Sequence, residues 1–255
     1  MKKFITGLTT LALVALATTA PAQQEASDES AVFPVEMYAC KYNERQVPAA
    51  LDAWTDIWNA WADENIQVPY SAWTLQPFYY GPDQDFDFIW LGISSDGASM
   101  GQAYDSYLAE GGDLLTGFRE IAECSAHEKY AAMAIKEPAA DDRGNFVLTF
   151  SDCDVAAGKS FDEVYPALQN WAEYRAGHGS ESGMWVLWPA YGGGEAGYDF
   201  KFAVSHKNYA GLGADFDQYA KKGHAKAEAL FADLLECDVA RAYNASLRRD
   251  GRETR

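Results

Sequence analysis

Strand and helix patterns alternate along the chain from residue 35 onward. Two stretches, 35–42 and 146–153, are rich in β-branched and aromatic residues and are predicted to be strands. Apolar residues then recur every three or four positions over 47–65 and 161–174, which predicts a helix with one apolar face after each strand. The two apolar stripes are Leu51, Trp54, Ile57, Trp58 and Trp61, and Phe161, Val164, Leu168, Trp171 and Tyr174.

Four more elements follow each helix in the same order. In the first half they are strands over 73–79 and 86–93, a helical region over 98–124 that is interrupted near Gly111, and a short strand over 130–135. In the second half they are strands over 185–191 and 198–205, a helical region over 210–237 that is interrupted near Gly223, and a short strand over 243–247. The order β-α-β-β-α-β therefore occurs twice. The proline of each second strand cannot donate a ladder hydrogen bond, so it is expected at a sheet edge or a bulge.

The second strand carries an internal repeat. The pattern Trp-x-Leu-x-Pro-x-Tyr-x-Gly begins at Trp73 and again at Trp185, 112 residues later. Matches continue on both sides of it, which indicates a duplication. We expect a first repeat over 33–136, a linker over 137–144 with the Pro, Gly and charge of a solvated connector, and a second repeat over 145–250.

The four cysteines follow the same repeat. Cys40 and Cys124 are 84 residues apart, and so are Cys153 and Cys237. Four cysteines allow three pairings, and a duplicated unit that folded alone favours one bridge within each half. The alternative of a four-cysteine metal site lacks any close C-x-x-C pair, so no metal is predicted.

The first residues predict export. Lys2 and Lys3 precede an apolar stretch, and Ala20-Pro21-Ala22 is typical of a cleavage site, so residues 1–22 are predicted to be a bacterial signal peptide and 23–32 a flexible segment. The protein is then periplasmic or secreted, with no membrane span in the mature chain. A formal net charge of −18 disfavours nucleic acid as a partner and is typical of a soluble acidic protein.

The duplicated β-α-β-β-α-β order is that of a ferredoxin-like unit. Two such units in one chain resemble the dimeric α/β-barrel superfamily, and the chain is similar to secreted bacterial proteins. The predicted fold class is α+β, with two tandem ferredoxin-like repeats packed as an intrachain pseudo-dimer. The resemblance covers nearly the whole mature chain but rests on topology and duplication, because no signature peptide supports it.

The strand pattern predicts which residues face the space between the two sheets. Cys124 is expected at the end of a helix, so Cys40 points toward the helices and Met37 toward the other sheet. In the third strands, Phe86, Phe88 and Trp90 are expected under the helices, with Tyr198, Phe200 and Phe202 in the second half. The candidate ligand-binding residues on the inner face are Met37, Phe150, Asp87, Asp199 and Lys201.

Few residues are candidates for catalysis. Asp87 and Asp199 recur in both halves and could pair as acid and base, although holding a turn is the more common role for such residues. His206 ends a strand and is the third candidate. The chain has no HExxH or P-loop motif, and the glycine-rich stretch 191–197 is predicted to be a hairpin turn. No cofactor is predicted from these residues; the superfamily resemblance implies haem as an alternative.

These features predict an exported soluble protein that binds a small, partly apolar ligand in the cleft between the repeats. One alternative is an oxidoreductase or monooxygenase of the dimeric-barrel type, with or without haem. Another is a protein-interaction module of the cell envelope. The residues leave open whether the chain is an enzyme and whether it forms oligomers.

Overall fold

The strands close into one barrel. The computed structural model describes residues 32–139, 144–194 and 196–251. The predicted signal peptide, most of segment 23–32 and residues 140–143 of the predicted linker lie outside this part. The strands of the first half are β1 (Val32–Tyr42), β2 (Tyr70–Tyr79), β3 (Phe88–Ser94) and β4 (Ala122–Lys136). Those of the second half are β5 (Phe146–Val155), β6 (Gly183–Tyr191), β7 (Phe200–His206), the short β8 (Leu235–Cys237) and β9 (Arg241–Arg249).

Each half contributes four strands in the same spatial order. They are β4-β1-β3-β2 in the first half and β9-β5-β7-β6 in the second, all antiparallel. The β4–β6 and β2–β9 ladders join the halves into a closed barrel of eight strands, with β8 added beside β5. In the closed barrel, β8 is the only described strand that pairs on one side alone. Unpaired strand edges can form hydrogen bonds with other chains.

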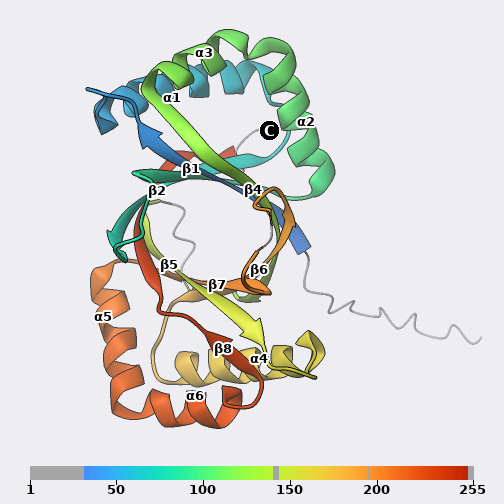
Figure 1. The fold of residues 1–255 in the computed structure, drawn as a ribbon, viewed down its shortest axis with the longest axis vertical. Coiled ribbons are helices and arrows are strands. Elements are labelled where there is room, and N and C mark those ends of the chain that lie inside the picture. Colours follow the sequence, from blue (N-terminus) through green and yellow to red (C-terminus); the bar gives the residue numbers. More distant parts are fainter. Residues whose placement is uncertain (1–31, 140–143, 195, 252–255) are drawn as a thin grey trace, which may run out of the picture.

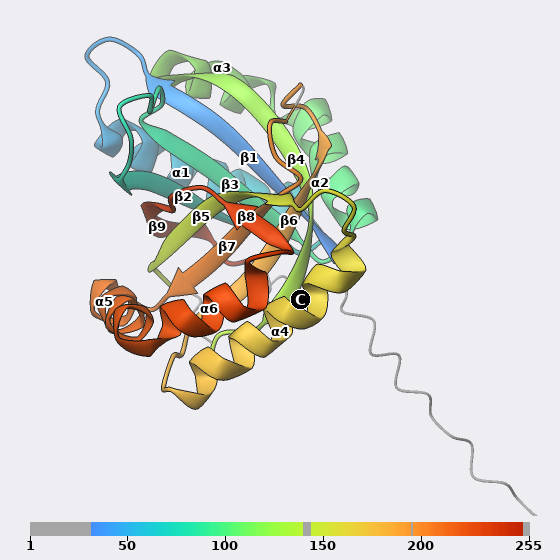
Figure 2. The same cartoon turned by 60° about the horizontal axis from the view of Figure 1, so that its bottom comes forward.

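Helices cover the barrel on two opposite sides (Figure 1). The first-half helices α1, α2 and α3 lie over β1, β3 and β4, and turning the molecule brings α4 and α6 of the second half forward (Figure 2). The bounds are α1 (Pro48–Asn65), α2 (Gly97–Glu110), α3 (Gly112–Ile121), α4 (Phe161–Gly177), α5 (Tyr209–Gln218), a π-helical turn (Tyr219–Gly223) and α6 (His224–Phe231). Among the described residues, no helix is long and apolar enough to cross a membrane.

Local signals explain where these helices begin. Pro48 occupies the first turn of α1, where a missing N–H costs nothing. The Asp96 carboxylate accepts a hydrogen bond from the Ser99 backbone at 2.8 Å and caps α2. Ser160 and Glu163 form a capping box at the start of α4.

The alternation of side chains divides the core into two layers. Met37, Ile89, Leu91 and their neighbours fill the barrel interior, which we call the lumen. Phe88 and Trp90 point outward and pack under the first-half helices, as predicted. In the predicted stripe of α1, Leu51, Trp54 and Trp58 are buried. Trp61 is partly buried and Ile57 is 63% exposed.

Several sequence-based expectations need correction. Phe86 packs with Tyr243 on the lumen side, and the hydroxyl of Tyr198 lies 3.1 Å from that of Tyr130, because β3 and β7 begin only at residues 88 and 200. The prolines lie beside bulges, which confirms one of the two places expected for them; β2 and β6 are both paired on two sides. The predicted short strand over 130–135 is a strand of 15 residues that begins at 122, so Cys124 lies on a strand and not on a helix.

Both predicted disulfides form. Cys40 pairs with Cys124 and Cys153 with Cys237, and in each half the two cysteines face each other across neighbouring strands. Each bridge therefore fastens the first strand of its half to the strand that follows its last helix.

Candidate functional site

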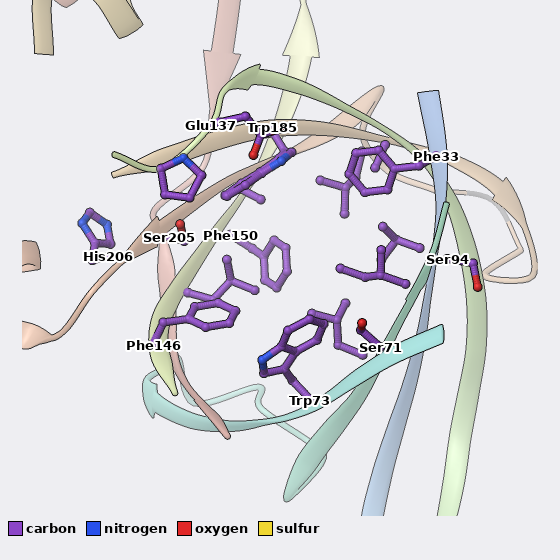
Figure 3. Close-up of a pocket in the computed structure, with 18 of the residues that line it drawn as sticks. Phe33, Ser71, Trp73, Ser94, Glu137, Phe146, Phe150, Trp185, Ser205 and His206 are labelled. Atoms are coloured by element: carbon purple, nitrogen blue, oxygen red, sulfur yellow. The ribbon is translucent and has the colours of Figure 1, made fainter. Parts of the chain in front are cut away.

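The lumen contains a cavity of about 510 Å³. Figure 3 shows aromatic rings from opposite sides of the barrel pointing toward its centre. Both halves contribute to its walls, and the main apolar residues are Trp73, Leu91, Phe146, Phe150, Trp185 and Leu187. Ser205 also lines the cavity, and its hydroxyl has no hydrogen-bond partner among the described residues. A concave, mostly apolar space with few polar groups is the usual form of a small-molecule site.

The repeated tryptophans lie in this wall. Trp73 is buried, and its indole N–H donates to the Gly144 carbonyl at 3.2 Å. Trp185 is partly buried against the same cluster. The tyrosines of the motif, Tyr79 and Tyr191, are exposed where the strands end. The repeat thus places one indole from each half in the lumen.

A second, more polar cavity of about 450 Å³ occupies the other end of the lumen. Met37, Phe150 and Lys201, which the strand pattern assigned to the inner face, all line it. Lys201 lies 2.7 Å from Asp152, and Arg241 lies 3.0 Å from the other oxygen of the same carboxylate. Phe150 lines both cavities, so it stands between the apolar and the charged end.

Asp87 and Asp199 are held by backbone groups. The carboxylate of Asp87 accepts a hydrogen bond from the Tyr42 N–H at 2.8 Å, and that of Asp199 accepts one from the Val155 N–H at 2.8 Å. Their own N–H groups donate to the carbonyls of the two strand cysteines. Neither residue lines the lumen cavities or the cavity beneath the first-half helices. Each carboxylate instead holds the end of a neighbouring strand.

His206 lies at the rim of the lumen, where it lines the edge of the apolar cavity. Its Nδ1 is 3.0 Å from a carboxylate oxygen of Asp215 on α5, which also pairs with the buried Arg175 of α4. Figure 3 shows the imidazole apart from the ring of cavity side chains. Burial raises the pKa of Asp215, but contacts with His206 and Arg175 outweigh it and hold this pKa below its ordinary value. His206 therefore joins helices to the barrel.

A third cavity, of about 560 Å³, lies outside the barrel wall beneath the first-half helices; we call it the outer pocket. At its base is Glu36 of β1, which is 1% exposed. Its carboxylate accepts hydrogen bonds from Tyr70 and, at 2.7 Å, from Tyr104, and it lies 3.1 Å from Nε2 of His127. Burial and the nearby carboxylate raise the pKa of Tyr70 and of Tyr104, so both remain protonated donors.

The outer pocket was not predicted from the sequence. Its polar residues come from four elements, β1, β2, α2 and β4, that are far apart along the chain. The one available signal was Glu36 itself, an acid four residues before Cys40 and so on the face of β1 that was expected to point toward the helices. An acid on a buried face needs partners, and such groups mark candidate sites.

No family model matches the chain, and no curated protein matches it in sequence. Solved structures match in fold. A candidate chlorite dismutase is 11% identical, with 88% of this chain and 98% of that chain covered and a TM-score of 0.53. A haem-binding protein from Thermus thermophilus and an anthrone oxidase-like protein are each 10% identical with TM-scores of 0.53, covering 87% and 86% of this chain and 94% and 92% of theirs. This likeness supports a dimeric α/β-barrel type of fold and nothing finer.

These names make haem a cofactor to consider. An axial ligand must have a free electron pair directed into a pocket. Nε2 of His127 already faces Glu36, and the cysteines are bridged. His206 contacts Asp215 through Nδ1, which leaves its Nε2 as a candidate ligand atom, because a metal-binding histidine commonly holds a carboxylate with its other ring nitrogen. Burial raises the pKa of Tyr38, which disfavours an iron-binding phenolate. No group of three metal-ligating side chains occurs in the described residues. Of these donors, the Nε2 of His206 is the one that remains a candidate axial ligand.

Proposed function

We propose that this chain is an exported protein that binds one small, partly apolar molecule in the lumen of its barrel. The observation that carries the proposal is the cavity of about 510 Å³ with aromatic and aliphatic walls from both halves. Burying apolar surface of a ligand there contributes roughly 25 cal/mol for each Å² removed from water. Ser205 supplies a polar group for orientation.

The proposal includes the architecture that builds the lumen. We propose two tandem ferredoxin-like repeats, over 33–136 and 145–250, joined by the linker 137–144. The same strand order in both halves and the two equivalent disulfides support it. Disulfides are also typical of proteins that work outside the cytoplasm, which supports a signal peptide over 1–22 and a periplasmic or secreted location.

The ligand's polar end is proposed to point toward the charged end of the lumen. Met37, Phe150 and Lys201 are the proposed contacts there. Asp87 and Asp199 contribute indirectly, because each holds the end of a neighbouring strand. No assembled nucleophile, base and oxyanion donor faces the lumen in the described residues, so binding is the activity proposed.

Binding of 1,6-diphenylhexatriene, a neutral probe that fluoresces in apolar surroundings, tests the proposal. We expect saturable binding of one probe molecule per chain. Ser205→Trp places an indole in the lumen and should weaken binding at least tenfold. The matched variant Leu115→Trp places the same side chain in the outer pocket and should leave lumen binding intact. Circular dichroism confirms that both variants fold.

Two outcomes would overturn lumen binding. The first is that the folded wild-type protein does not bind the probe. The second is that Leu115→Trp, and not Ser205→Trp, removes binding. Native mass spectrometry of the purified protein would then identify any molecule retained from the cell, and its loss in Ser205→Trp would assign it to the lumen.

Haem-dependent oxidation is the second candidate, because one structure similar in fold is described as haem-binding. Adding haemin to the purified protein tests it directly. From the donors described above we expect no Soret band that depends on His127, so a histidine-ligated haem would have to depend on His206. A Soret band that is lost in His127→Ala or in His206→Ala would favour the haem-dependent alternative and identify the ligand.

A further inference from the structure

We infer that the outer pocket is a second binding site, separate from the lumen, and that it takes an organic cation: a protonated amine or quaternary ammonium group on an aromatic or aliphatic body. The site consists of the Glu36 carboxylate and the aromatic side chains around it. It is independent of the proposed lumen function, since the barrel wall separates the two spaces.

The first step is the charge on Glu36. This side chain is almost fully buried, and in the described part of the chain its one ion-pair partner is His127, whose side chain is 48% exposed. No lysine or arginine among those residues pairs with it. A carboxylate can accept about four hydrogen bonds; Tyr70, Tyr104 and His127 lie within hydrogen-bond distance, and the Tyr38 hydroxyl also interacts with Glu36. Most of these donors are neutral hydroxyl groups, which do not balance a negative charge, and Glu36 lines the pocket from which a cation would come.

The second step is that the fold does not require a buried acid here. Glu36 pairs with Gly92 across β1 and β3, four residues before the disulfide cysteine. The matching pair across β5 and β7 is Thr149 with Val204, and it is also buried. The second half thus closes the same ladder without a charge. Burying an unneeded carboxylate costs free energy, which indicates that Glu36 serves a purpose other than packing.

The third step is the composition of the walls. Aromatic rings line the outer pocket on several sides, and the residues are Trp54, Trp58, Trp90, Tyr104, Tyr107 and Phe118. Several are fixed by edge-to-face contacts; the ring centroids of Trp58 and Trp90, for instance, are 5.1 Å apart. Aromatic faces attract cations, and organic ammonium groups are commonly bound in this way.

The fourth step concerns the remaining charges. Arg119 and Glu123 also line the pocket, but both are exposed and opposite in sign, so they leave its base negative. The net charge of −18 for the whole chain draws cations toward the surface. A large apolar volume with one buried negative group then selects a bulky cation over a hydrated metal ion.

Calorimetric titration with a matched pair of probes tests this inference. Naphthalen-1-ylmethylamine is protonated at pH 7, and naphthalen-1-ylmethanol is its neutral counterpart. The wild-type protein should bind the amine at one site at least tenfold more tightly than the alcohol. Glu36→Gln keeps the shape but removes the charge, so it should abolish this preference while alcohol binding persists.

The strong negative charge of the protein requires a control. Glu123→Gln changes the net charge by the same amount at the mouth of the same pocket and should preserve the preference. Leu115→Trp should remove binding of both probes, whereas Ser205→Trp should leave it unchanged. Failure of the lumen probe with retained amine selectivity would thus reject the lumen proposal alone.

Equal binding of the two probes by the wild-type protein would overturn the inference, and so would an equal loss in Glu36→Gln and Glu123→Gln. Should Glu36→Gln fail to fold, a crystal structure of the wild-type protein with the amine decides. The inference requires the amine nitrogen within hydrogen-bond distance of Glu36, and an amine bound elsewhere rejects it.

Discussion

At the scale of single residues, position 92 requires glycine because the side chains of Glu36 and Tyr70 lie against it. A methyl group added at this position would come within 2.6 Å of Glu36 Oε1 and closer still to the Tyr70 hydroxyl. Gly92→Ala should therefore lower the free energy of unfolding by about 1–3 kcal/mol, since buried groups must move apart. Urea denaturation measures the change.

The matched control for this substitution is Gly101→Ala in α2. No atom lies within 4 Å of the added methyl group, and alanine favours a helix, so stability should rise by up to about 1 kcal/mol. Tyr70→Phe removes the nearest atom to the added group, so Gly92→Ala should cost less in that background. An equal cost in both backgrounds would contradict this explanation.

Asp215 should make a part of the stability depend on pH. It neutralises the buried Arg175, so Asp215→Asn leaves a cation unpaired and should cost about 3–5 kcal/mol at pH 7. The pKa of Asp215 is depressed in the folded protein. Its stabilisation is therefore fully present above the unfolded-state pKa of about 4 and is lost as the pH falls through the folded-state pKa.

Denaturation curves at several pH values test this effect. The difference between the wild-type protein and Asp215→Asn should shrink as the pH falls below about 4. Asp217→Asn, two residues away, removes an exposed pair with Lys221 and should change little at any pH. A difference that stays constant down to about pH 2 would show that the ionisation of Asp215 does not matter.

Which residues meet at a site was harder to predict than which elements form. The outward orientation of Phe88 and Trp90 could be predicted from the alternation of side chains along one strand. The contacts of Glu36 with Tyr104 and His127 did not, because those side chains are 68 and 91 residues away along the chain. The choice of His206 rested on its place at a strand end, and only the structure shows its contact with Asp215.

At the scale of elements, β4 shows how pairing overrides local pattern. Residues 122–129 are polar and alanine-rich, and the helical region was expected to run through 124. In the structure this segment pairs with β1, and the ladder with β6 begins only at Lys129. Ladder hydrogen bonds to β1 determine the conformation of this segment, and a single-sequence pattern does not contain them.

The disulfides should stabilise the two halves to a similar degree but with different local effects. Each closes a loop with a sequence separation of 84, so removing either bridge by a Cys→Ala pair should cost roughly 4 kcal/mol in urea denaturation. Cys124 lies within a strand of 15 residues, whereas Cys237 ends a strand of only three. Loss of Cys153–Cys237 should therefore release β8 alone.

Hydrogen exchange distinguishes these local effects. The amides of β8 should exchange much faster in Cys153→Ala/Cys237→Ala, while those of β4 near residue 124 remain protected in Cys40→Ala/Cys124→Ala. Unchanged stability in both double variants would rule out a structural role for the bridges.

At the scale of the whole molecule, the two halves complete each other. The ladders β2–β9 and β4–β6 are the ones that cross between them, and the apolar cluster of the lumen contains residues from both. Each half alone would therefore expose two strand edges and one apolar sheet face. The duplicated order of elements predicted this architecture in outline. The registers of the two ladders that close the barrel depend on bulges at Pro77 and Pro189, and the sequence does not specify the position of these bulges.

A polypeptide of residues 32–139 should consequently not persist as a folded monomer. Its free β2 and β4 edges favour pairing with a second copy, because the second half offers the same strand order to those edges in the intact chain. We expect dimers or larger assemblies in size-exclusion chromatography with light scattering. Adding residues 144–251 should restore a one-to-one complex and the lumen binding of 1,6-diphenylhexatriene. A monomer of residues 32–139 that unfolds cooperatively would show instead that the first half completes its own core and that barrel closure adds little to its stability.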